Sequence, residues 1–75
     1  MAELRRGSSG SEVRDQQRKL KRLGFDIGLV DGQFGSRMEN AVQSFQRAQG
    51  FSTVDGVIAG HTRARIDQMA ATVGN

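Results

Sequence analysis

Two aspartates are the first residues of this 75-residue sequence whose type and spacing could do chemistry. A pair such as Asp31 and Asp55 could supply the acid and base of glycoside hydrolysis. Each aspartate is followed directly by glycine, however, and an Asp-Gly pair in a turn uses its carboxylate to accept backbone N–H groups. The pattern therefore favours two structural turns, Asp31-Gly32 and Asp55-Gly56, over catalysis.

The other polar residues form no catalytic or metal-binding group. His61 is the only histidine, the chain has no cysteine, and no acidic residue stands near His61 at metal-ligand spacing. The serines have no neighbouring base, so hydrogen bonding at helix starts explains them better than nucleophilic attack. The stretch Gly7-Ser8-Ser9-Gly10 follows no strand and precedes no suitably placed lysine, which argues against a phosphate-binding loop. The sequence predicts no enzyme, no metal site and no cofactor.

An internal two-fold repeat surrounds the two aspartates. The stretch Val30-Asp31-Gly32-Gln33-Phe34-Gly35 returns 24 positions later as Val54-Asp55-Gly56-Val57-Ile58-Ala59. Each copy follows a helix-like segment that ends in Gly-Phe. Gln17 and Gln46 occupy matching positions in the two helix-like segments, and we expect both to hydrogen-bond the loop backbone, with ligand contact as the alternative.

Hydrophobic periodicity predicts the helix that precedes the first turn. Its buried stripe contains Val13, Leu20 and Leu23, at helical spacing. Ser9 and Glu12 fit a capping box, which places the helix start within residues 9–11, and Gly24 should end the helix in a left-handed conformation. Gln16 interrupts the stripe and is expected to place a polar group on the buried side. Residues 25–30 should form a packed loop rather than a strand.

Two further helices and an N-terminal arm complete the prediction. Ser36 and Glu39 suggest a second capping box at the start of the second helix. The third helix should start at 60–61 and fray after residue 71, and Leu4 should anchor the arm. The expected core residues of the two helices are Met38, Ala41, Val42, Phe45, Thr62, Ile66 and either Met69 or Ala70. The predicted fold is all-α: one compact three-helix bundle over residues 1–75, with its core in 4–70.

The order and spacing of these motifs resemble the peptidoglycan-binding domain family. The resemblance covers residues 4–70. It rests on the segment from Leu4 to Val13, then Gln17-x-x-Leu20-x-x-Leu23-Gly24-Phe25, the first Val-Asp-Gly turn, Ala41-Val42-x-x-Phe45-Gln46 and the second Val-Asp-Gly turn. Gln16 stands where the family usually has leucine, and Met38 where it commonly has threonine.

The resemblance implies a non-catalytic module that binds cell-wall peptidoglycan and directs an attached or associated hydrolase to it. The binding surface is then a groove between the second and third helices and their loops. The residues expected to line this groove are Phe34, Gly35, Arg37, Asn40, Gln43, Val57, Ile58 and His61.

The charge distribution supports one alternative function. Residues 1–25 hold seven Lys/Arg against three acids, whereas residues 26–75 hold four against five. A basic three-helix domain could bind nucleic acid with Arg14, Arg18, Lys21 and Arg22 on phosphates. The basic stripe lacks aromatic residues and no helix resembles a recognition helix, so nucleic acid is the weaker alternative. A protein-contacting or pro-domain-like role without sugar binding is a third possibility.

The sequence gives few indications of location. No apolar run reaches the ~18–20 residues of a membrane span, and the N-terminal residues lack the apolar region of a signal peptide. The resemblance implies action at the bacterial cell wall or periplasm as a monomer. The delivery route would then be that of a phage lysis or tail component, an injected effector or part of a longer exported protein.

Overall fold

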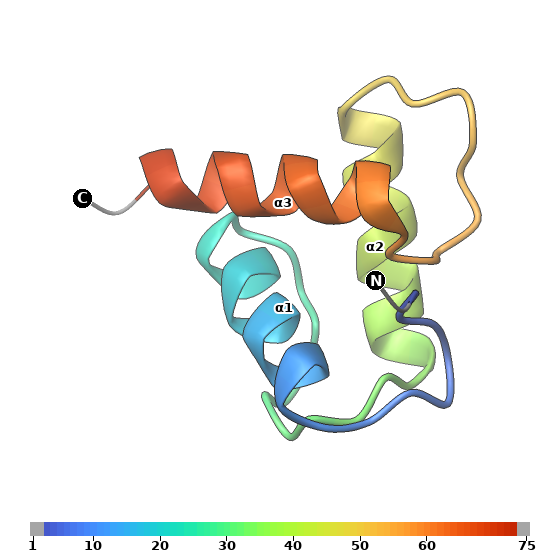
Figure 1. Ribbon diagram of the computed structural model, residues 1–75, viewed down its shortest axis with the longest axis vertical. Coiled ribbons are helices and arrows are strands. Elements are labelled where there is room, and N and C mark those ends of the chain that lie inside the picture. Colours follow the sequence, from blue (N-terminus) through green and yellow to red (C-terminus); the bar gives the residue numbers. More distant parts are fainter. Residues whose placement is uncertain (1–2, 74–75) are drawn as a thin grey trace.

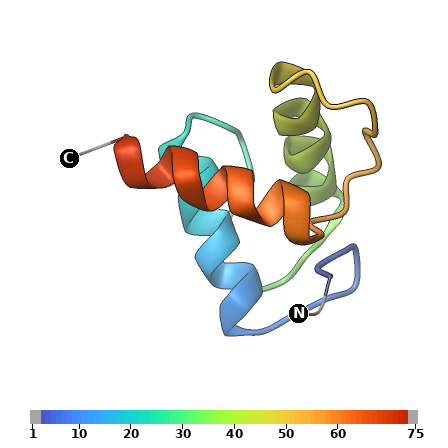
Figure 2. The ribbon, with the colours of Figure 1, turned by 45° about the horizontal axis from the view of Figure 1, so that its top comes forward.

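The computed structural model describes residues 3–73, which form three helices joined by two long loops (Figure 1). Helix α1 spans Ser11–Arg22, α2 spans Ser36–Ala48 and α3 spans Gly60–Thr72. Helix α3 crosses α1 and packs against it, and the start of α3 lies beside α2 (Figures 1 and 2). The described residues form no strand, only two isolated β-bridges. The predicted all-α fold is confirmed; residues 1–2 and 74–75 of the predicted domain lie outside the described range.

The helix ends agree with the sequence, but the predicted capping boxes are wrong. Helix α1 begins at Ser11 and α2 at Ser36, and their N-cap residues are Gly10 and Gly35, which have no side chain to cap with. Glu12 is therefore the second helical residue and Glu39 the fourth, instead of the third position that a capping box requires. Helix α3 includes residue 72, one residue beyond its expected end.

The C-terminal ends of α1 and α2 have the same geometry. Gly24 has φ of 96° and Gly50 has φ of 74°, the left-handed region that glycine adopts without a Cβ clash. The N–H of Phe25 donates to the carbonyl of Leu20 at 3.0 Å, and the N–H of Phe51 donates to that of Gln46 at 3.0 Å. These Schellman bonds turn both phenylalanines back onto Phe45, with edge-to-face ring contacts at 5.7 and 6.3 Å.

One apolar core lies between the helices and beneath both loops. Phe45 and Val42 of α2 are fully buried, as are Val13 and Leu20 of α1. Phe34 and Ile58 follow the two Asp-Gly turns and enter this core with 3% and 0% exposure. The expected core residues of α2 and α3 are all buried; at the last expected position Ala70 is buried and Met69 partly so. Burial of this set is the main stabilising contribution to so small a chain.

The N-terminal arm, residues 4–10, runs past both Asp-Gly loops. Leu4 exchanges two backbone hydrogen bonds with Ile58, at 3.0 and 2.8 Å. Farther along, the N–H of Phe34 donates to Ser8 and the N–H of Gly10 donates to Gly32, both at 2.9 Å. Leu4 itself is 5% exposed, which confirms its predicted anchoring role. The arm thereby joins the two repeats in a way that the repeat pattern does not indicate.

Gln16 lies on the buried side of α1, as predicted, with no exposed surface. Its Nε2 donates to Oδ1 of Asp67 on α3 at 3.0 Å, and Nζ of Lys19 donates to the same oxygen at 2.8 Å. The Oε1 atom of Gln16 is buried with no hydrogen-bond partner. A half-satisfied amide therefore stands at the α1–α3 contact.

Candidate functional site

The first Asp-Gly loop is closed by the side chain of Gln17. Its Oε1 accepts the N–H of Gly32 at 2.9 Å, and its Nε2 donates to the carbonyl of Gln33 at 2.9 Å and to Oδ1 of Asp31 at 3.2 Å. The same Asp31 oxygen accepts the N–H of Gln33 at 2.9 Å. Both ends of one buried amide are thus used to hold the loop.

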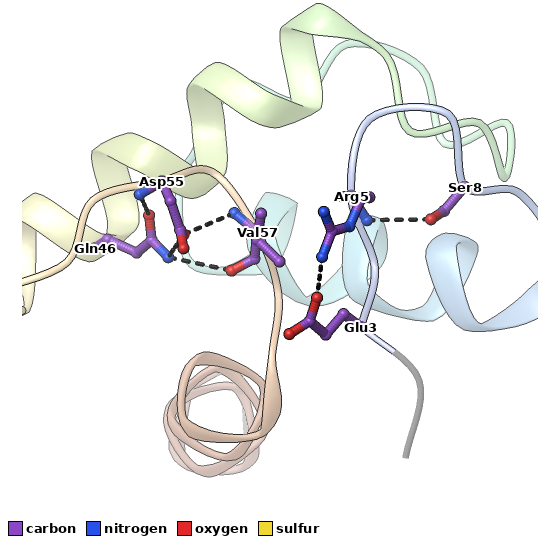
Figure 3. Close-up of polar contacts among 6 residues, drawn as sticks. All are labelled: Glu3, Arg5, Ser8, Gln46, Asp55 and Val57. Atoms are coloured by element: carbon purple, nitrogen blue, oxygen red, sulfur yellow. Dashed lines mark hydrogen bonds and ion pairs between the residues drawn. The ribbon is translucent and has the colours of Figure 1, made fainter.

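Gln46 closes the second loop in the same way (Figure 3). Its Oε1 accepts the N–H groups of Asp55 and Gly56 at 3.1 and 3.0 Å. Its Nε2 donates to Oδ1 of Asp55 at 3.1 Å, to the carbonyl of Val57 at 3.2 Å and to the hydroxyl of Thr62 at 3.3 Å. The prediction that both glutamines bond the loop backbone is confirmed, since the amides are buried and their bonds are directed at the loops.

Hydrogen bonding stabilises the ionised form of both turn aspartates and lowers the pKa of each. The N–H of Gln33 lowers the pKa of Asp31 below its usual value, helped by the Gln17 amide, and the N–H of Val57 does the same for the pKa of Asp55. A carboxylate that accepts backbone N–H groups favours its charged form. Neither residue holds a proton at neutral pH, so neither is suited to act as a general acid.

A pocket of about 320 Å³ lies beside the first loop. One wall comes from residues 27–29 and the other from the start of α2. Arg37 stands at its edge and pairs with Asp26 at 3.2 Å, where both side chains are largely exposed. Leu29, 79% exposed, adds an isolated apolar surface. The full lining consists of Gln17, Ile27, Gly28, Leu29, Asp31, Gln33, Gly35, Ser36, Arg37 and Met38.

A second pocket of about 220 Å³ lies beside the second loop. The rings of Phe51 and His61 lie 4.4 Å apart between centroids in its wall, and the guanidinium of Arg65 lies 5.6 Å from the Phe51 ring. Three hydroxyl side chains, from residues 52, 53 and 62, line the same pocket. The full lining consists of Gln46, Phe51, Ser52, Thr53, Asp55, Val57, Ala59, His61 and Thr62.

The two pockets are related by the sequence repeat. Six positions of the first lining correspond to six of the second: the clamping glutamine, the turn aspartate and four residues that follow it. In the first pocket these are Gln17, Asp31, Gln33, Gly35, Arg37 and Met38; in the second they are Gln46, Asp55, Val57, Ala59, His61 and Thr62. The two pockets thus have corresponding lining positions but different side chains, with an arginine in the first where the second has a histidine.

The residues predicted to line one groove are divided among several places. Gly35 and Arg37 line the first pocket, whereas Val57 and His61 line the second. Asn40 is exposed on α2 outside both pockets, and Gln43 lies under Gly56, where an added Cβ would be 3.2 Å from its Cγ. Phe34 and Ile58 need correction: their side chains are buried core residues and offer no surface to a ligand.

The sequence reasoning missed the wall formed by Phe51, Ser52 and Thr53. The repeat contained a usable signal, since the Gly-Phe end of α2 is followed within four residues by the second Asp-Gly turn. So short a connection keeps the residues after Phe51 beside the turn. The contact between His61 and Phe51 depends on tertiary packing, so the sequence carries no signal for it.

Two structural observations bear on other kinds of site. Within residues 3–73, no three His, Asp or Glu side chains gather closely enough to hold a metal ion. In the same range, no helix combines the length and apolar character needed to cross a bilayer.

Comparison with known proteins identifies the family. Residues 9–66 match the family described as "Putative peptidoglycan binding domain". The chain belongs to this family, and the three-helix fold with two clamped loops is its architecture here.

Relatives of the chain include bacterial cell-wall enzymes. It is 43% identical over 53 residues to N-acetylmuramoyl-L-alanine amidase CwlM of Mycobacterium tuberculosis. The matched region covers 71% of this chain and 13% of that protein. It is 33% identical over 60 residues to the spore cortex-lytic enzyme of Bacillus subtilis, 80% of this chain and 20% of the enzyme. The chain therefore spans only a small part of these curated relatives.

A solved structure matches nearly the whole chain. The crystal structure of the SleB N-terminal domain superposes with a TM-score of 0.87 at 35% identity. The match covers 92% of this chain and 93% of that domain. The fold described here thus corresponds to one complete structural unit in a related protein.

Proposed function

We propose that this chain binds bacterial cell-wall peptidoglycan and catalyses no reaction. The observation that carries the proposal is the second pocket, a concave surface with aromatic and hydroxyl side chains in a chain that belongs to the peptidoglycan-binding family. An aromatic face packs against the apolar face of a sugar ring, and hydroxyls and backbone groups bond its polar edge. Phe51 and His61 supply the faces, and Ser52, Thr53 and Thr62 supply the hydroxyls.

The first pocket is proposed as a secondary contact for peptidoglycan, because six of its lining positions correspond to positions of the second pocket. Arg37 would meet a carboxylate of a stem peptide there, since a guanidinium binds carboxylates in bidentate fashion. Its pairing with Asp26 is exposed and offers little resistance to exchange for a ligand. Gly35 lines the same pocket and has no side chain to occupy it. Asn40 and Gln43, on α2 between the two loops, would contact a ligand long enough to reach both pockets.

The hydrogen bonds of Asp31 and Asp55 support the proposal that the chain is not catalytic. Both carboxylates accept backbone N–H groups, and both pKa values are lowered. Glycoside hydrolysis needs one carboxyl with a raised pKa that can protonate the leaving group. The two aspartates thus serve the loops, and the module would direct an attached or associated hydrolase to the wall instead of acting on it.

The wall is also the proposed site of action. Proteins named for amidase and cortex-lytic activity carry a region similar to this one as a minor part of their length. A module with the same fold would hold such a protein at its insoluble substrate. Linking a weak binding module to an enzyme raises the enzyme's effective concentration at the polymer.

Co-sedimentation with purified, insoluble peptidoglycan tests the proposal. The protein should sediment with the polymer, and His61→Ala should weaken binding clearly, because it removes one of the two rings. Arg37→Ala should weaken binding less. Gln68→Ala is the matched control: Gln68 is exposed on the same helix as His61 and lies outside both pockets.

Two results would overturn the proposal. Equal binding by His61→Ala, Arg37→Ala and the control would remove both pockets from recognition. Release of soluble fragments from the polymer by the wild-type chain, abolished by Asp31→Asn, would show that an aspartate is catalytic. A melting curve for each variant confirms that binding is compared between folded proteins.

A further inference from the structure

Helix α1 carries two distinct sets of charged side chains. The set that faces α3 is paired: Lys19 lies 2.8 Å from Asp67, and Glu12 lies 3.5 Å from Arg63. Asp15 on the same side of the helix lies 3.0 Å from Lys19. These charges take part in the contact between the two helices and are not free to bind a partner.

The second set is a basic stripe formed by Arg14, Arg18, Lys21 and Arg22. All four side chains are exposed. At 100° per residue the four occupy a continuous arc of about 100°, on the side of α1 turned away from the α3 contact. Among the described residues, no carboxylate lies within ion-pair distance of any of them. The stripe is therefore an unpaired surface of four positive charges on a chain whose net charge is +3.

The stripe ends at the first Asp-Gly turn, whose Asp31 lines the first pocket. The Nη2 atom of Arg14 would lie 3.5 Å from a Cβ placed on Gly32, so its guanidinium covers the first Asp-Gly turn. Its charge also contributes to lowering the pKa of Asp31. A partner lying along the stripe would reach the edge of the proposed peptidoglycan contact without occupying it.

We propose that the basic stripe binds a linear, base-free phosphodiester polymer of the cell envelope, in which polyol units alternate with phosphates. Arg14, Arg18 and Arg22 recur every four residues, which places them about 6 Å apart along the helix axis. Evenly spaced cations in a row suit a flexible chain with phosphates at regular intervals. Three of the four cations are arginines, whose planar fork matches phosphate oxygens.

Nucleic acid fits the stripe less well. Proteins that bind single strands alternate cations with aromatic rings on which bases stack. Phe34 and Phe45 are buried, Phe25 packs on Phe45, and Phe51 lies in the second pocket against His61. None of the four phenylalanines is thus an exposed residue set between the cations of the stripe, as a base-stacking ring would be.

A lipid surface also fits less well. Helices that lie in the membrane interface insert an exposed apolar face. The apolar side of α1 contains Val13 and Leu20, both with no exposed surface. Exposed Leu29 stands alone at the first pocket, on a loop. Charge without an insertable face favours a soluble or wall-attached polyanion.

Binding of the full chain to purified poly(glycerol phosphate) tests this inference. Placing the polymer in the envelope rests on the proposed function, but the assay omits peptidoglycan, so either can fail alone. Three to four phosphate contacts predict a slope of log affinity against log salt of about −2 to −3. Arg18→Glu should reduce the steepness of this slope by about 0.7 or more and weaken binding at low salt.

Arg47→Glu is the matched control, because Arg47 is an exposed arginine of α2 with no ion pair among the described residues. It causes the same change in net charge and should leave most of the affinity. Arg18→Gln should show an intermediate effect, which separates lost contact from added repulsion. Peptidoglycan stripped of phosphate polymers should bind wild-type and Arg18→Glu proteins alike.

Several outcomes would overturn the inference. Absence of binding to the polymer would contradict the inference directly. Equal weakening by Arg18→Glu and Arg47→Glu would show that binding depends only on net charge. Tighter binding to single-stranded DNA, to anionic vesicles or to polyglutamate at matched charge would assign the stripe to a base-bearing, lipid or carboxylate partner.

Discussion

One buried amide closes each Asp-Gly loop. A glutamine side chain carries an acceptor and two donors, so it can accept loop N–H groups with its oxygen and donate to a carbonyl and a carboxylate with its nitrogen. Gln17 and Gln46 use both ends in this way. Glutamate has a similar shape but no donor when it is ionised. The choice of glutamine is therefore set by hydrogen-bond chemistry.

Gln46→Glu tests this requirement. The new carboxylate would face Oδ1 of Asp55 across a bond that is now 3.1 Å, with no donor between them. We expect about 2–3 kcal/mol lower stability at pH 7, from a lost bond and like-charge repulsion, and partial recovery below pH 5 as one carboxyl protonates. Urea unfolding at both pH values measures it. Gln49→Glu, which keeps an acceptor for Arg65, should be nearly neutral; equal losses would contradict the argument.

Gln16 is the opposite case, an amide used at one end only. Gln16→Leu removes the buried, unpartnered Oε1 and adds apolar contact. It also removes the hydrogen bond from Gln16 to Asp67, whose bond with Lys19 remains. We expect about 1 kcal/mol of added stability in urea unfolding. A clearly destabilised variant would mean that the bond to Asp67 outweighs the cost of the unsatisfied oxygen.

At the scale of elements, the N-terminal arm determines how the two repeats are joined. Sequence alone predicted its anchor, Leu4. It did not predict the backbone pairing with Ile58 and Phe34, because such pairing leaves no mark on side-chain periodicity. Through these backbone hydrogen bonds the arm contacts both Asp-Gly loops and connects one to the other.

Leu4→Ala tests the importance of this arm. Leu4 is 5% exposed, so truncation should cost about 2–3 kcal/mol of stability, in the usual range for a buried leucine. Hydrogen exchange of the Ile58 amide, which donates to the Leu4 carbonyl at 2.8 Å, should quicken more than that of core amides. Arg5→Ala, at an exposed neighbour, is the control. Unchanged Ile58 exchange would show that the arm is not needed to hold the second loop.

Two glycines separate backbone strain from packing. Gly50 and Gly56 have nearly equal φ, 74° and 73°, so alanine is strained at both by about 1–2 kcal/mol. A Cβ at Gly50 meets nothing within 4 Å, whereas one at Gly56 lies 2.7 Å from Cγ and 3.3 Å from the carbonyl of Glu39. Gly56→Ala should therefore lower the melting temperature more than Gly50→Ala. Equal shifts would mean that the loop moves away from α2 at no cost.

The helices and the core were predictable because both depend on periodicity that the sequence displays. Helix starts were located, but the capping residue was misassigned, because the residues at the caps are Gly10 and Gly35 and an adjacent serine imitates the motif. The glutamine clamps were inferred from the repeat. The division of the predicted groove into two pockets was not, since it depends on which side chain after each turn points inward.

At the scale of the whole molecule, charge is divided between structural and unpaired groups. The carboxylates of Asp15, Asp26 and Asp67 lie in ion pairs, and those of Asp31 and Asp55 accept loop hydrogen bonds. Among residues 3–73, the largest group of charges without an ion pair is positive and lies on α1. A surface organised in this way keeps its stabilising charges separate from those available to a partner.

Acid should therefore destabilise the whole molecule through its carboxylates. The pKa values of Asp26, Asp31, Asp55 and Asp67 are lowered in the folded state. A folded pKa below the unfolded value of about 3.9 gives stability that is fully present above that value and is lost as pH falls through the folded pKa. The melting temperature should stay level from pH 7 to about 5 and fall steadily below 4.

Acid can lower stability through loss of the hydrogen bonds to the aspartates and through repulsion among the remaining positive charges. The salt dependence of stability distinguishes these two causes. Protonation of the carboxylates leaves the 11 lysines and arginines without balancing charge, five of them on α1, and these positive charges repel one another. Raising the salt concentration from 0.1 to 1 M shortens the Debye length from about 10 to about 3 Å and should restore the part of stability lost to repulsion. Salt should not restore the hydrogen bonds that the carboxylates of Asp31 and Asp55 accept. Melting curves at pH 3 should recover only partly for the wild type, and full recovery would mean that the loop carboxylates contribute nothing to stability.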